Sequence, residues 1–186
     1  RECVKHTINA KTLAPAASAS NKIFNGNTTA SCTISLTGVV TGDTVTASAG
    51  SGTFADKNVG TGKKVTCSSI TLAGADKANY TLSSTSVTTT ANITKYTPTL
   101  AISGTSGSVA ANSTKTFTAT PTTISACLGT LTATSASTSY VTVTGGASTS
   151  SAASGTAVTI TYKGIAYTSG TNITVAYTPT DTMSYS

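Results

Sequence analysis

Tryptophan is absent from this chain, and aromatic residues of any kind make up only 5% of it. Charged residues account for 9% of the sequence, against about 25% in ordinary soluble domains. The sequence has five acidic residues and one histidine, His6. A paired-carboxylate hydrolase or a histidine-activated nucleophile would have little to draw on, so we expect no catalytic residues and no enzyme activity.

Motifs for metals and cofactors are missing as well. Asp43, Asp56, Asp76 and Asp181 each stand alone in a turn-like segment, and none has the Asp-x-Asp-x-Asp spacing of a calcium loop. Aspartate is a common turn former, which accounts for all four positions without a ligand. The four cysteines do not have the spacing of zinc ligands. We therefore expect no metal site and no cofactor.

The charge pattern does not favour nucleic acid as a partner. Nine basic residues and four acids precede residue 97, whereas two basic residues and one acid follow it. A nucleic-acid surface needs a dense basic stripe or interleaved aromatics, and neither is present, so we expect no nucleic-acid partner. Scattered lysines favour a solvated surface over a weak attraction to an anionic polymer.

Helical periodicity is also lacking. No stretch of ten or more residues has a 3.6-residue apolar stripe, and the alanine-rich segment around Pro15 is predicted as a loop. No apolar span of membrane length and no signal peptide occur, so we expect no membrane insertion and interpret the chain as a mature or excised segment. Threonine and valine suit strands, and the composition predicts an all-β fold.

The stretch from Gly38 to Tyr80 carries the clearest order. Val45, Ala47 and Ala49 alternate with threonine and serine, as in a strand buried on one face. The strand before it places Cys32, Ile34 and Leu36 on one face. Later, the apolar residues Val65 and Cys67 fall at odd positions, whereas Ile70 and Leu72 fall at even positions, on the opposite face of a regular strand. This change predicts a β-bulge near Ser68 and Ser69.

Two segments have the spacing of a tyrosine corner, in which an immunoglobulin-like sandwich anchors a loop with a phenol hydroxyl. The first runs from Asp76 to Tyr80 and the second from Asp181 to Tyr185. Both pairs are candidate structural sites.

Four cysteines, Cys3, Cys32, Cys67 and Cys127, favour an oxidising exterior. Cys32 and Cys67 both share a face with core aliphatic residues, so a disulfide between sheets is the first hypothesis for this pair. Buried free thiols are the alternative, because cysteine is often a small core residue. The connectivity of Cys3 and Cys127 stays open.

Four motifs in order resemble one known family: Phe24-Asn25-Gly26, then GVVTGDTV, GTFADKNVGTGKKV and ITLAGADKANYTL. Together, over about residues 5 to 95, they resemble the YDG domain, a glycine-rich, mostly-β repeat of large bacterial surface proteins and adhesins. The family's Tyr-Asp-Gly is replaced here by Phe24-Asn25-Gly26, which removes a phenol hydroxyl and a carboxylate.

The second half resembles bacterial Ig-like modules. A linker from Lys95 to Thr99, interrupted by Pro98, separates it from the first, and Gly/Ser-rich turns then divide short strands at the spacing of a sandwich. We expect two tandem antiparallel β-sandwich (Ig-like) domains, residues 1–96 and 97–186. A strand follows Tyr80, whereas the sequence ends one residue after Tyr185. Domain two thus either lacks a closing strand or is complete with fewer strands.

These resemblances imply a non-catalytic structural or adhesive module of a repetitive bacterial cell-surface protein, located outside the cell. Its partners would be neighbouring repeats of the parent chain and a host or cell-wall glycan or protein that the sequence does not identify. The alternative is a carbohydrate-binding or enzyme-accessory module, although such modules stack sugars on exposed aromatics, which are few here.

Overall fold

A computed structural model of the chain describes residues 3–4, 6–104, 107–122, 129–145, 150–152, 157–166 and 170–181. Within these residues the fold is nearly all β, and the single helical element is one 3-10 turn, η1 (Lys77–Asn79). The chain divides into two compact units, Arg1–Thr94 and Lys95–Ser186, with the division two residues before the position expected from the sequence.

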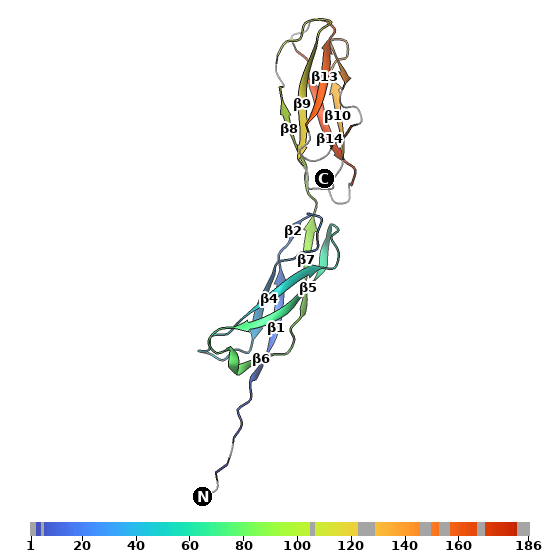
Figure 1. Cartoon of the computed structure of the whole chain (residues 1–186). Coiled ribbons are helices and arrows are strands. Elements are labelled where there is room, and N and C mark those ends of the chain that lie inside the picture. Colours follow the sequence, from blue (N-terminus) through green and yellow to red (C-terminus); the bar gives the residue numbers. More distant parts are fainter. Residues whose placement is uncertain are drawn as a thin grey trace. The chain divides into compact units, whose positions relative to one another are not determined.

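The described residues of unit 1 form seven strands, arranged in two sheets (Figure 1). One sheet has the order β3-β1-β6 and the other β2-β7-β5-β4. Their bounds are β1 (Lys11–Ala19), β2 (Lys22–Ile23), β3 (Cys32–Thr37), β4 (Thr46–Phe54), β5 (Gly60–Ala73), β6 (Tyr80–Leu82) and β7 (Val87–Thr94).

Two-residue periodicity explains most of these strands. In β3 the side chains of Cys32, Ile34 and Leu36 are half-buried between exposed neighbours, as the sequence predicts. The same alternation holds for Ala47 and Ala49 in β4. The centre of unit 1 is small and aliphatic, and its most buried side chains are Leu13, Phe54, Val65, Cys67, Ile70 and Ile93.

The prediction of a loop around Pro15 is wrong, because this segment forms β1. Pro15 pairs with Leu36 of β3, whereas the parallel partner β6 reaches only as far as Leu13. From Pro15 onward, the edge of β1 that faces away from β3 pairs with no other strand of the described residues. Proline has no backbone N–H to donate, and at this edge no ladder hydrogen bond is lost. The described residues before β1 form no strand, and among them Val4 is 73% and Ile8 97% exposed.

The predicted bulge near Ser69 is wrong, although the change of buried face from which it was inferred is present. Burial does change parity there, but Ala49 pairs with Ile70 and Ser51 with Ser68, so the register between β4 and β5 does not shift. Ser69 has a φ of 54°, and a Cβ placed on Gly50 would lie 2.9 Å from the Ser69 Cβ. Both strands change sides together at this close contact, so no extra residue is needed.

Unit 1 is not purely antiparallel, which corrects that part of the expectation. Residues Lys11 to Leu13 of β1 pair in parallel with β6, and β2 pairs in parallel with the end of β7. The N-terminal segment therefore joins both sheets in turn: β1 belongs to one and β2 to the other.

Unit 2 also contains two sheets, ordered β12-β10-β14 and β11-β13-β9-β8. Its strands are β8 (Thr99–Ser103), β9 (Thr114–Thr122), β10 (Gly129–Ser135), β11 (Val141–Gly145), β12 (Ser150–Ala152), β13 (Val158–Gly164) and β14 (Ile173–Pro179). The core is centred on Phe117, Leu131 and Ile160. A Cβ on Gly129 would fall 2.3 Å from the Tyr177 ring, so glycine makes room for this aromatic side chain.

Candidate functional site

A disulfide bond joins the two sheets of unit 1. Cys32 on β3 and Cys67 on β5 are bonded, with Cα atoms 6.1 Å apart, which confirms the pairing preferred from the sequence. Cys67 is completely buried. Cys3 is a free, exposed thiol, and Cys127 lies outside the described residues.

Glycine at position 52 makes room for this bond. Gly52 pairs with Cys67 across β4 and β5. A Cβ at this position would lie 2.7 Å from the Cys32 Sγ and 2.5 Å from the Ala30 carbonyl oxygen. No side chain fits there, so the disulfide and Gly52 form one packing unit that sequence spacing did not reveal.

Tyr80, at the start of β6, anchors a distant turn through its hydroxyl. The buried phenol donates a hydrogen bond to the Asp43 Oδ2, at 2.6 Å, and accepts one from the Val40 backbone N–H, at 3.0 Å. The bond to the Asp43 carboxylate, followed by desolvation, raises the pKa of the Tyr80 phenol. A tyrosine corner bonds to backbone a few residues upstream, whereas this hydroxyl reaches a turn 37 to 40 residues earlier.

Asp76 does not bond to Tyr80; its carboxylate accepts a hydrogen bond from the Thr44 N–H, at 2.7 Å. Asp76 and Tyr80 flank η1 and so hold both ends of the segment from Val40 to Thr44. The second candidate pair cannot be placed in the same way. Asp181 is exposed, and Tyr185 lies outside the described residues.

A cage of oxygen atoms surrounds the ammonium group of Lys22, which the sequence did not single out. Four acceptor oxygens share its three N–H groups: the Asn25 Oδ1 and Asn27 Oδ1, both 3.0 Å from the Nζ, and the backbone oxygens of Asn27 and Thr29, at 2.7 and 3.0 Å. The Nζ also lies 5.3 Å from the centre of the Phe54 ring, a cation–π contact. Desolvation lowers the pKa of Lys22.

This cage gives the Phe24-Asn25-Gly26 motif a structural role. Phe24 is buried in the core, and Gly26 has a φ of 82°, a conformation that favours glycine. Asn25 retains one acceptor oxygen and uses it for Lys22. Asn25 therefore carries no charge but supplies the acceptor oxygen that Lys22 uses.

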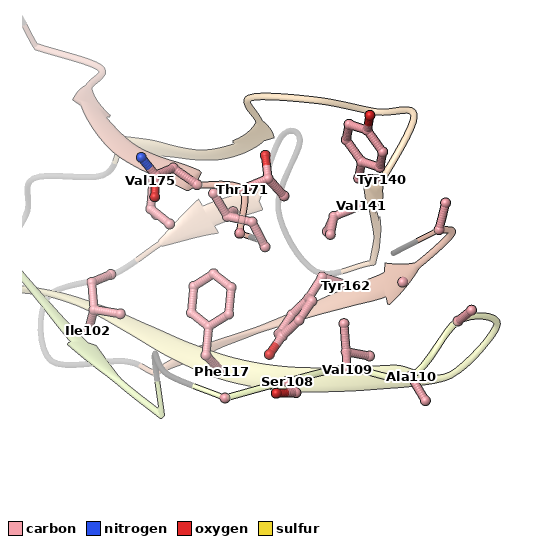
Figure 2. A pocket seen from close by; sticks show the side chains of 17 residues that line it. Ile102, Ser108, Val109, Ala110, Phe117, Tyr140, Val141, Tyr162, Thr171 and Val175 are labelled. Atoms are coloured by element: carbon pink, nitrogen blue, oxygen red, sulfur yellow. The ribbon is translucent and has the colours of Figure 1, made fainter. Parts of the chain in front are cut away.

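Unit 2 contains an open cavity of about 950 Å³ with a mixed polar and apolar lining. Figure 2 shows Phe117 and Tyr162 pointing into it from one sheet, with Thr171 and Val175 on the opposite side. The two rings lie 6.0 Å apart at an interplanar angle of 50°. Tyr140, 40% exposed, also lines this space. No Asp, Glu, Lys, Arg or His is among the described residues that line the cavity.

Charged groups in unit 1 serve local structure. Lys63 and Asp56 form an ion pair with a 2.5 Å separation between Nζ and Oδ1, and this hydrogen bond lowers the pKa of Asp56. His6 is exposed. Across the described ranges, no three or more His, Cys, Asp or Glu residues gather as a group that could hold a metal ion. The same part of the chain contains no helix long and apolar enough to cross a membrane.

A comparison with known families finds one match, which covers part of the chain. Residues 9–91, the greater part of unit 1, match the family model of the YDG domain. The matched range contains the disulfide, the Tyr80 anchor and the Lys22 cage. No curated protein and no solved structure matches the chain significantly.

Proposed function

We propose that this chain is a non-catalytic structural and adhesive module of a repetitive bacterial cell-surface protein. The observation that carries the proposal is the YDG match over residues 9–91. The resemblance of the sequence motifs to a repeat of large bacterial surface proteins and adhesins supplies the rest of the proposal. Residues 95–186 would supply a second module, similar to bacterial Ig-like units.

The disulfide supports a location outside the cell. Disulfides persist in oxidising compartments and are rare in the cytosol. The bond between Cys32 and Cys67 lies between the two sheets of unit 1, with one sulfur completely buried, so it belongs to the packed core of the unit.

Each unit fits an Ig-like β-sandwich in its proportions. The described residues of each unit form one three-stranded and one four-stranded sheet. In unit 1 a buried tyrosine anchors a loop through its hydroxyl. Ig-like sandwiches also anchor a loop with a tyrosine hydroxyl, although theirs bonds to backbone closer in the sequence. The parallel contacts of β1 and β2 would correspond to an N-terminal strand that passes from one sheet to the other.

Surface labelling tests this proposal. An antibody against the purified chain, applied to intact bacteria that express the parent protein, should label them without permeabilisation. A matched antibody against a cytosolic protein provides the control for cell integrity. Labelling that appears only after permeabilisation would contradict the extracellular location and, with it, the surface role.

One observation favours a second candidate, a carbohydrate-binding module. Tyr140 is an exposed aromatic at the cavity of unit 2, and aromatic faces stack on sugars. A glycan array probed with the chain and with Tyr140→Ala would decide between the two functions. Specific binding that Tyr140→Ala abolishes supports the module, whereas equal signals from both proteins contradict it.

A further inference from the structure

The first and last segments of unit 1 run side by side in the same direction. The N-terminal segment passes through β1 and β2, and β2 pairs in parallel with the end of β7, with Lys22 opposite Ile93 and Ile23 opposite Thr94. The chain therefore enters this pair from one end of unit 1 and leaves β7 at the other end (Figure 1).

Hydrogen bonds outside the short ladder strengthen this junction. The Phe24 N–H donates to the Thr94 carbonyl oxygen, at 2.8 Å, and the Thr94 hydroxyl donates to the Lys22 carbonyl oxygen, at 3.4 Å. On the other side of the pair, the Asn92 N–H donates to the Asn21 Oδ1, at 2.7 Å. Bonds thus join the two segments from Asn21 through Phe24.

We infer that unit 1 is a force-bearing module whose parallel β2–β7 junction resists extension along the chain. Tension at the N-terminal end of the unit acts on β1, which pairs with β3 and β6, and through β1 it pulls β2 toward its N-terminus. Tension at the other end pulls β7 toward its C-terminus. In a parallel pair these directions are opposite, so the bonds across the junction are loaded together. Strands pulled apart from the same end would instead lose their bonds one at a time.

Lys22 ties the junction to the rest of the sheet. Its ammonium holds the turn from Asn25 to Thr29, and that turn bonds to β4 through the Phe54 N–H and the Thr28 carbonyl oxygen, at 2.7 Å. The Ala30 N–H bonds to the Gly52 carbonyl oxygen, at 2.9 Å. The segment sheared by tension is therefore secured to β7 on one side and, through Lys22, to β4 on the other.

The disulfide limits what tension could release. Cys32 lies after the sheared N-terminal segment, and Cys67 lies before β7. When the junction fails, the 35-residue interval between the cysteines stays closed and cannot extend. At about 3.5 Å per residue this interval withholds about 12 nm of chain.

Single-molecule pulling of the full chain tests the inference. Cys3→Ser and Cys127→Ser leave only Cys32 and Cys67 to form a bond. Handles at the two ends of this chain load the junction in shear. In a second geometry, the N-terminal handle is kept and an azide-bearing amino acid replaces Ser86, just before β7, so that both strands are pulled from the same end.

We expect the unfolding event of unit 1 to lengthen by about 12 nm when reductant is added. Unfolding should also require at least about two-fold more force in shear than in the second geometry, because forced unfolding follows the rate of barrier crossing. Equal forces in the two geometries would overturn the shear junction. Equal extensions with and without reductant would overturn the limit set by the disulfide.

Lys22→Met supplies a further readout, with Lys64→Met as the matched control, because Lys64 is exposed on the neighbouring strand β5. The shear force should fall in Lys22→Met and stay unchanged in Lys64→Met; equal falls in both would contradict the role of the cage.

The inference deepens the structural role proposed above and rests on it. Surface labelling does not depend on mechanics, so the two proposals can fail separately.

Discussion

The hydroxyl of Tyr80 lies 2.6 Å from the Asp43 carboxylate, although 37 residues separate the two in sequence. Because the same hydroxyl accepts a bond from the Val40 N–H, one phenol fixes both ends of a surface turn to the strand β6. Unit 1 thereby connects the turn before β4 with the segment that follows β5.

Tyr80→Phe should destabilise unit 1 by about 0.5 to 1.5 kcal/mol, because the ring still packs while the part-buried hydrogen bonds to the Val40 N–H and the Asp43 carboxylate are lost. Asp43→Asn is the matched variant: it keeps an acceptor oxygen and should cost less. Urea denaturation of the full chain measures both changes. A Tyr80→Phe protein as stable as the native one would show that the hydroxyl contributes nothing.

The same residue should give the stability a pH dependence. Since folding raises the pKa of the phenol, its contribution is fully present below the unfolded value of about 10 and is lost as pH rises through the folded value. The stability difference between the native chain and Tyr80→Phe should therefore shrink above about pH 10. Denaturation curves at several alkaline pH values would reveal it, and a difference independent of pH would contradict the assignment.

Loss of the disulfide should lower the stability of unit 1 by about 3 to 4 kcal/mol, the chain-entropy value for a closed loop of 35 residues. The Cys3→Ser, Cys127→Ser chain, compared with and without reductant, isolates this bond. Peptide mapping under non-reducing conditions should recover Cys32 joined to Cys67. An unchanged denaturation midpoint after complete reduction would refute the stabilising role.

Gly52→Ala should destabilise unit 1 by about 2 kcal/mol or more, because its Cβ would overlap the Ala30 carbonyl oxygen and the Cys32 Sγ. The variant should also retain free thiols after oxidative refolding, which a thiol assay can count. Gly60→Ala is the control, since its Cβ would meet only the flexible Lys63 side chain, at 3.4 Å. Similar losses in the two variants would point to backbone effects instead.

Asn25→Asp restores the second residue of the family motif beside the Lys22 ammonium. The site is exposed, so the new ion pair should add no more than about 1 kcal/mol, and less in high salt. Melting temperatures at low and high ionic strength test this, with Asn58→Asp, in an exposed turn next to Asp56, as a control that places its charge away from Lys22. A gain that is insensitive to salt would contradict the electrostatic explanation.

Much of unit 1 follows from local patterns. Alternation placed β3 and β4, and the shared faces of Cys32 and Cys67 pointed to their bond. The prediction of a loop around Pro15 was wrong because the alanines, serines and proline of this segment have weak strand propensity. Pairing with β3 and β6 holds the segment in β1. The partner of Tyr80 was missed because nothing local to Tyr80 indicates a turn almost 40 residues away.

The sequence by itself determined the all-β class and the buried faces of strands such as β3 and β4, because period and β-branched composition act within a few residues. Only the tertiary structure decided which strands pair in parallel, where Asp43 and Tyr80 meet, why position 52 holds glycine, and that Lys22 is caged by the turn after β2. These features depend on contacts between segments distant in sequence, whose geometry exists only once both sheets have packed together.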